Sequence, residues 1–142
     1  MKKICILFLS LFTFISCNES LKLLSATKQI VFPGRPTEKA FTNYILKFSV
    51  DYNTQINVDS IKVSQGDKHH TTTKYLLKSE NASSYSKSIT EKGIYTIEIP
   101  LKNIHNQNSL STKNNILLYL KENNKLKEFK VSKFKNEEKR KR

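Results

Sequence analysis

The sequence is short of cysteine, glycine, proline and tryptophan. Its 142 residues include two cysteines, three glycines, three prolines and no tryptophan. Both cysteines, Cys5 and Cys17, lie within the first seventeen residues. The rest of the chain therefore offers no disulfide, no thiolate metal site and no cysteine nucleophile. A domain of this length can bury enough apolar surface to fold without disulfides, so their absence does not argue against export.

The few glycines also exclude a phosphate-binding loop. Each stands alone at a turn position, and none belongs to a Gly-rich phosphate cradle or a Gly-x-Ser-x-Gly nucleophile elbow. Six acidic residues of the domain are spread one to a segment: Asp51, Asp59, Asp67, Glu80, Glu91 and Glu98. We therefore predict that the protein is not an enzyme and uses no cofactor.

Positive charge is abundant. The 25 Lys and Arg residues outnumber the 12 Asp and Glu residues, which gives a formal net charge of +13. Such a balance suits anionic partners, and for an exported protein we expect an acidic glycan or a phospholipid headgroup and not a nucleic acid. The alternative is that the lysines only keep the chain soluble, since they are spread along its whole length.

The first residues have the pattern of a leader. Lys2 and Lys3 form a basic start, and Ile4 to Ile15 form an apolar run interrupted only by Ser10 and Thr13. A permanent membrane helix needs about 20 apolar residues, so this run fits a cleaved signal peptide better than a span.

The segment Phe14-Ile15-Ser16-Cys17 resembles the lipobox of bacterial lipoproteins. The small Ser16 fits that pattern, whereas Phe14 replaces the usual leucine and Ile15 is bulkier than usual. The resemblance implies a diacylglyceryl group on the Cys17 sulfur, cleavage just before Cys17 and acylation of the new amine. A plain secretory signal cut near Ser16 or Ser20, or an uncleaved anchor, are the alternatives.

The lipoprotein resemblance also implies a location. In that family an aspartate after the cysteine favours the inner membrane, and this chain has Asn18. We therefore expect a lipid-anchored protein of the cell envelope, at the outer membrane of a Gram-negative bacterium. The predicted organisation is a signal peptide over residues 1–16, a lipidated tether over 17–24, one domain over 25–134 and a basic flexible tail over 135–142.

The domain shows period-two alternation typical of strands. In the clearest case, Phe41 to Tyr52, the apolar or aromatic residues of one parity are Tyr44, Leu46, Phe48, Val50 and Tyr52. A slip in parity at Asp59-Ser60 predicts a bulge, and Glu122 to Lys125 predicts a hairpin turn. The pattern predicts an all-β fold: a single antiparallel β-sandwich of seven or eight strands, resembling immunoglobulin-like or fibronectin-like domains, with a closed barrel as the alternative. A polar stretch from Lys102 to Asn115 is expected to be a loop.

Four groups of residues are candidate sites. The rigid Pro33 to Thr37 loop presents Arg35, with Lys39 beside it, and could bind a carboxylate or phosphate. His69 and His70 are adjacent, so on a strand they would point to opposite faces and could not easily share a metal ion. The tyrosines could form a glycan-stacking platform, although core packing explains them more simply. The basic C-terminal tail could touch anionic headgroups or could be only a solubilising end.

Together these patterns predict a membrane-anchored lipoprotein that acts by binding and not by chemistry. Its partner would be another envelope protein or an anionic glycan, contacted through Arg35, Lys39 and the lysine-rich surface. The alternative is a small inhibitor or immunity-type lipoprotein that blocks an enzyme.

Overall fold

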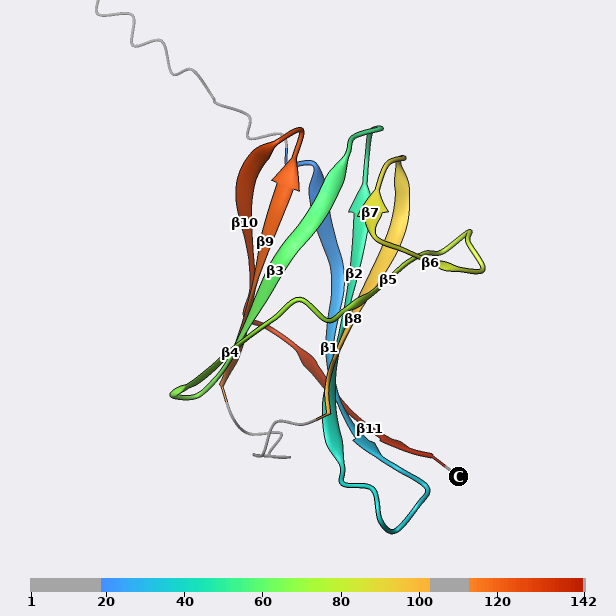
Figure 1. Ribbon diagram of the computed structural model, residues 1–142, viewed down its shortest axis with the longest axis vertical. Helices are drawn as coiled ribbons and strands as arrows, with labels where there is room; N and C mark the ends of the chain where they lie inside the picture. Colours follow the sequence, from blue (N-terminus) through green and yellow to red (C-terminus); the bar gives the residue numbers. More distant parts are fainter. Residues whose placement is uncertain (1–18, 103–112, 142) are drawn as a thin grey trace, which may run out of the picture.

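The computed structural model describes residues 19–102 and 113–141, and there the chain is all-β (Figure 1). Eleven strands, more than the seven or eight predicted, form two open sheets, and this part of the chain contains no helix. It accordingly has no helix that is long and apolar enough to cross a membrane. Cys17 lies outside the described residues.

The first sheet has six strands, in the order β11-β1-β2-β8-β5-β6. The bounds of these strands are β1 Leu21–Phe32, β2 Phe41–Val50, β5 Leu76–Ser79, β6 Tyr85–Ser86, β8 Gly93–Leu101 and β11 Lys135–Arg140. Every neighbouring pair is antiparallel except β1 and β11, which run parallel.

The second sheet has five strands, in the order β10-β9-β3-β4, with β7 also paired to β3. Their bounds are β3 Ile56–Gln65, β4 Lys68–Thr72, β7 Ser88–Ile89, β9 Asn114–Glu122 and β10 Lys125–Val131. All its pairs are antiparallel.

The two sheets share one apolar core. Along β2, Tyr44, Leu46, Phe48 and Val50 are buried in alternation, which confirms the parity predicted from the sequence. They belong to a single cluster with buried side chains of the other sheet, such as Ile61, Val63, Ile116 and Leu118. Each such side chain contributes about 1.5–3 kcal/mol through its removal from water. The core therefore holds the sheets face to face, as in a β-sandwich.

The predicted turns and irregularities are also present. The β9–β10 hairpin turns at Asn123 and Asn124, whose φ angles are 49° and 64°. Asparagine tolerates the left-handed region that a two-residue hairpin requires at both positions. The β3–β9 register shifts between Val58 and Ser60, where the sequence predicted a bulge.

Two predictions about the ends of the domain are wrong. The predicted tether extended to Leu24, but β1 begins at Leu21, which is in register with Val50 at the C-terminal end of β2. The predicted flexible tail instead forms β11, which pairs with Thr27 to Phe32. The lysines and glutamates of β11 show no apolar alternation, so its pairing depends on the edge of β1 and not on its own pattern. The expected loop over Lys102 to Asn115 lies mostly outside the described residues, and Asn114 already belongs to β9.

The sandwich has two chemically different ends. The proximal end contains the start of β1, where Leu21, Val50 and Gly93 are in register across three strands. The distal end contains the β1–β2 loop and the β3–β4 turn, and it also contains Lys141, the last described residue (Figure 1). The 12 residues of β1 connect the two ends. At about 3.3 Å per residue, the ends are separated by roughly 36 Å.

Deletion of residues 135–142 tests the role of β11. We expect the free energy of unfolding to fall by about 3 kcal/mol, because several edge hydrogen bonds of about 1 kcal/mol each are lost. Urea denaturation of the mature chain would measure this change. Removal of Lys141 and Arg142 alone should cost no more than about 1 kcal/mol, since Lys141 contributes one backbone bond, from its N–H to the Phe32 carbonyl. Equal midpoints for the wild type and the longer deletion would support a flexible tail.

Candidate functional site

The distal end gathers positive charge. Its basic residues come from the β1–β2 loop, the β3–β4 turn, the flanks of β8 and β9, and the end of β11; they are Arg35, Lys39, Lys68, Lys102, Lys113, Lys139, Arg140 and Lys141. Fewer acidic residues lie there, namely Glu38, Asp67, Glu137 and Glu138. This end is therefore positive on balance and suits an anionic ligand.

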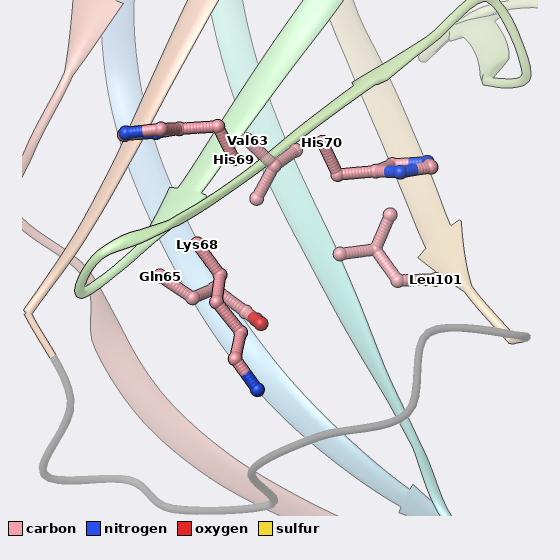
Figure 2. A pocket seen from close by; sticks show the side chains of 6 residues that line it. All are labelled: Val63, Gln65, Lys68, His69, His70 and Leu101. Atoms are coloured by element: carbon pink, nitrogen blue, oxygen red, sulfur yellow. The ribbon is translucent and has the colours of Figure 1, made fainter.

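A hollow of about 360 Å³ opens at this end between β3, β4 and the end of β8. Its lining residues are Val63, Gln65, Lys68, His69, His70 and Leu101 (Figure 2). In the β3–β4 ladder, Lys68 is opposite Gln65 and His70 is opposite Val63. Lys68 and His70 therefore share the inward face of the sheet with two buried residues, although both are exposed.

The hollow owes its polarity to the short strand β4. Most inward positions elsewhere in the sandwich carry buried apolar side chains, whereas β4 places an exposed ammonium and an exposed imidazole on this face. Figure 2 shows Lys68 and Gln65 extending the same way from the β3–β4 turn, with His70 above Leu101. The arrangement supplies hydrogen-bond donors beside an apolar wall.

A buried polar cluster lies behind the hollow. The Gln65 amide donates to the Tyr44 hydroxyl at 3.0 Å, and this hydroxyl donates to Asn114 Oδ1 at 3.0 Å. The ammonium of Lys28, which is 0 % exposed, also lies 3.4 Å from Asn114 Oδ1. Burial lowers the pKa of Lys28 and raises the pKa of Tyr44, whose bond with Gln65 opposes the rise. The cluster holds Gln65 in place at the inner wall of the hollow.

The histidines confirm the orientation predicted for adjacent strand residues. His69 and His70 point in opposite directions, and His69 Nδ1 lies 2.8 Å from the Ser64 hydroxyl on the outer face (Figure 2). The described residues contain no group of three His, Cys, Asp or Glu side chains able to hold a metal ion. The site has the groups to bind an anion through Lys68 and His70.

The structure places the predicted pair Arg35 and Lys39 at the distal end. Both are exposed in the β1–β2 loop, which is closed by a bond from the Glu38 N–H to the Arg35 carbonyl at 3.1 Å. They share this end with the hollow, but neither residue lines it. The sequence reasoning missed the hollow because Lys68 and His70 face inward only through the pairing of β4 with β3.

The tyrosines do not form one platform. Tyr44 and Tyr95 are buried, Tyr75 and Tyr119 are half-buried, and only Tyr52 and Tyr85 are exposed. The exposed two lie on different segments, the β2–β3 loop and β6. Core packing, the simpler of the two interpretations, accounts for most of them.

A second polar cluster, which the sequence did not reveal, closes the proximal end. The Glu122 side chain is only 5 % exposed and forms an ion pair with Lys127. It accepts hydrogen bonds from the hydroxyls of Thr54 at 3.1 Å, Tyr52 at 3.3 Å and Ser20. This carboxylate thus connects the start of β1, the β2–β3 loop and the β9–β10 hairpin.

The environment of Glu122 sets its protonation. Burial alone would raise the pKa of Glu122, but the bonds from Lys127, Ser20 and Thr54 and the charge of Lys127 outweigh burial. Its pKa therefore lies below the usual 4.5. Because the pKa is lower in the folded state, the cluster stabilises the fold fully above pH 4.5, and this contribution disappears as the pH falls through the lowered pKa.

Replacement of Glu122 by glutamine should show this linkage. We expect Glu122→Gln to lower the free energy of unfolding at pH 7 by about 2 kcal/mol, as for a lost charged hydrogen-bond acceptor. Below pH 4.5 the difference between the variant and the wild type should shrink. Urea midpoints between pH 3 and pH 7 would measure both effects.

The matched control is Glu128→Gln, which removes an exposed carboxylate from the same hairpin. It should change the stability by less than about 0.5 kcal/mol at either pH. A Glu122→Gln variant with the stability and acid sensitivity of the wild type would contradict the assigned role of this carboxylate.

Comparison with protein-family models, curated proteins and solved structures gives no match to this chain.

Proposed function

We propose that this chain is a lipid-anchored binding module of the cell envelope, without enzymatic activity, whose distal end binds an anionic glycan. One observation carries the proposal: the chain enters the sandwich at the proximal end, whereas the basic loops and the hollow lie at the distal end (Figure 1). An anchor at Cys17 would hold the proximal end at the bilayer and turn the basic end outward. The outer membrane, expected from Asn18, is the proposed location.

The surface chemistry favours a glycan over a protein partner. Protein interfaces usually have an apolar, aromatic centre. The exposed large apolar side chains of the described part are Leu24, Tyr52, Leu76, Tyr85 and Leu126, and all of them lie outside the distal loops and turns. The distal end instead offers the ammonium of Lys68, the imidazole of His70 and the guanidinium of Arg35. Carboxylate or sulfate groups of an acidic polysaccharide would match these donors.

We also propose that the sandwich is of the immunoglobulin-like or fibronectin-like type. An immunoglobulin-like or fibronectin-like arrangement is supported by two mostly antiparallel sheets whose consecutive strands repeatedly change sheet, as from β2 to β3 and from β8 to β9. Such modules present loops at both ends of a rigid body. This suits a protein with an anchor at one end and a binding site at the other.

Charge reversal at the distal end tests the binding proposal. We expect the mature chain to be retained on an immobilised sulfated polysaccharide at low salt and to elute as salt screens the contacts. Arg35→Glu combined with Lys68→Glu should weaken binding about tenfold, because a loss of about 1.4 kcal/mol changes the affinity by that factor. Titration at several salt concentrations would measure the affinity of each variant.

The matched control reverses two exposed lysines of the proximal end, Lys22 and Lys92. If general basicity drives retention, this control will weaken binding as much as the distal variant does, and the proposed site is wrong. Salt-insensitive capture of a single envelope protein, with no retention on the polysaccharide, would instead favour a binding module whose partner is a protein.

The anchor has a separate test. Cells fed a fatty-acid probe should label the wild-type chain and should not label Cys17→Ala, because the thiol is the acceptor of the diacylglyceryl group in the lipoproteins this leader resembles. The wild type should fractionate with membranes, since each buried CH₂ contributes about 0.8 kcal/mol to bilayer binding. An unlabelled wild-type chain in the soluble fraction would refute the anchor.

A further inference from the structure

We infer that the proximal end docks directly against the lipid headgroups, so that the sandwich stands upright on the bilayer and does not swing on a tether. The partner surface is the membrane that holds Cys17. This inference rests on the anchor in the proposed function, but it concerns a different property: the orientation of the anchored domain. It follows from the short stretch of chain between Cys17 and Ser20, where the folded domain begins.

The free part of the tether is very short. Cys17 and Ser20 are three residues apart, and an extended chain spans at most about 3.6 Å per residue. Ser20 must therefore lie within roughly 11 Å of the acylated residue. The predicted tether over residues 17–24 would have allowed more than twice that reach, but β1 takes its last four residues into the sheet.

Ser20 is a fixed point and not part of the tether. It is 4 % exposed, and its hydroxyl donates to the Glu122 carboxylate. The next residue, Leu21, is buried in the core and in register with Val50. The rigid body of the protein therefore begins at Ser20, and Asn18 and Glu19 are the whole connection to Cys17.

The Glu122 cluster also makes the proximal end one rigid surface. The same carboxylate binds Tyr52 and Thr54 from the β2–β3 loop and Lys127 from β10. The Asn123 N–H donates to the Gln55 carbonyl at 3.2 Å, and the Lys92 N–H donates to Asn53 Oδ1 at 2.9 Å. Three neighbouring loops are thus linked to one another beside the point where the chain emerges.

The chemistry of these loops suits headgroups and not acyl chains. The surface segments are residues 51–55, 90–92 and 123–124, which are largely exposed and, apart from Tyr52, polar. Their acidic and basic residues are close to balance, with Asp51 and Glu91 beside Lys92 and Lys125. The short tether and not charge would therefore set the orientation, and salt should have little effect on it.

The absence of tryptophan makes the orientation measurable. Single-tryptophan variants of the mature chain can be made at exposed positions, Lys92→Trp at the proximal end and Glu38→Trp at the distal end. Each variant is coupled through Cys17, its only thiol, to a maleimide lipid in vesicles that contain a dansyl-headgroup lipid. Energy transfer from tryptophan to dansyl then reports the distance of each end from the headgroups.

We expect transfer from Lys92→Trp to be several times that from Glu38→Trp, because the two ends are roughly 36 Å apart. The ratio should persist at high salt. A flexible Gly-Ser insertion of about 20 residues between Asn18 and Glu19 spans roughly 25 Å on average, and it should bring the two signals close together. Equal transfer from both variants without the insertion would overturn the inference, as would a ratio that the insertion leaves unchanged.

Chemical coupling keeps this test independent of the proposed function. The vesicles impose the anchor, so a chain that cells fail to acylate can still be tested for orientation. Failure of fatty-acid labelling in cells would refute the anchor alone, whereas equal energy transfer on vesicles would refute the upright docking alone.

Discussion

The pairing of β1 is the constraint on which the molecule depends. This strand is bonded to β2 along nearly its whole length and to β11 along its second half. It begins at Leu21, directly after the buried Ser20, and ends at the loop that presents Arg35. One strand therefore sets the distance between Ser20 and the basic end, and it also pairs with the C-terminal strand β11 at the sheet edge.

The two ends use buried polar groups in different ways. At the proximal end, several donors converge on the Glu122 carboxylate and link the loops to the start of the chain. At the distal end, the buried Tyr44 hydroxyl accepts a hydrogen bond from Gln65, and Gln65 lines an open hollow. Between them the core is almost wholly apolar. A fully bonded buried network adds rigidity because breaking any one bond leaves a costly unsatisfied group. The proximal end is thus suited to attachment, and the distal end keeps donors available to a ligand.

Much of the sandwich could be predicted because its central strands carry their own pattern. The alternation from Tyr44 to Val50 and the hairpin at Asn123 and Asn124 are local signals, and both appear in the structure. The start of β1 and the whole of β11 have no such pattern, since their residues are held by a neighbouring strand and not by their own apolar face.

The candidate site residues also divide into those that a local sequence pattern locates and those that depend on tertiary pairing. Exposed Arg35 and Lys39 could be located from the Pro-Gly-Arg-Pro loop, whose conformation is local. The burial of Lys28 and Glu122 could not be predicted, because charged residues are normally exposed. Both residues have partners far away in sequence, such as Asn114 for Lys28 and Thr54 for Glu122. The inward orientation of Lys68 likewise depends on strand register, which composition does not encode.

The geometry also separates two interpretations of the basic charge that the composition leaves open. A basic C-terminal segment could neutralise headgroups of the membrane that holds the anchor, but β11 is fixed to the distal half of β1. Its last residues, Lys139 and Arg140, pair with Val31 and Phe32, roughly 36 Å from the proximal end. The screening length at physiological ionic strength is about 8 Å, so charges at that distance gain almost nothing from those headgroups. If the anchor is at Cys17 and the domain stands upright, the positive end can act only on something outside its own membrane, and this is why a soluble or wall-bound polyanion is the partner to test.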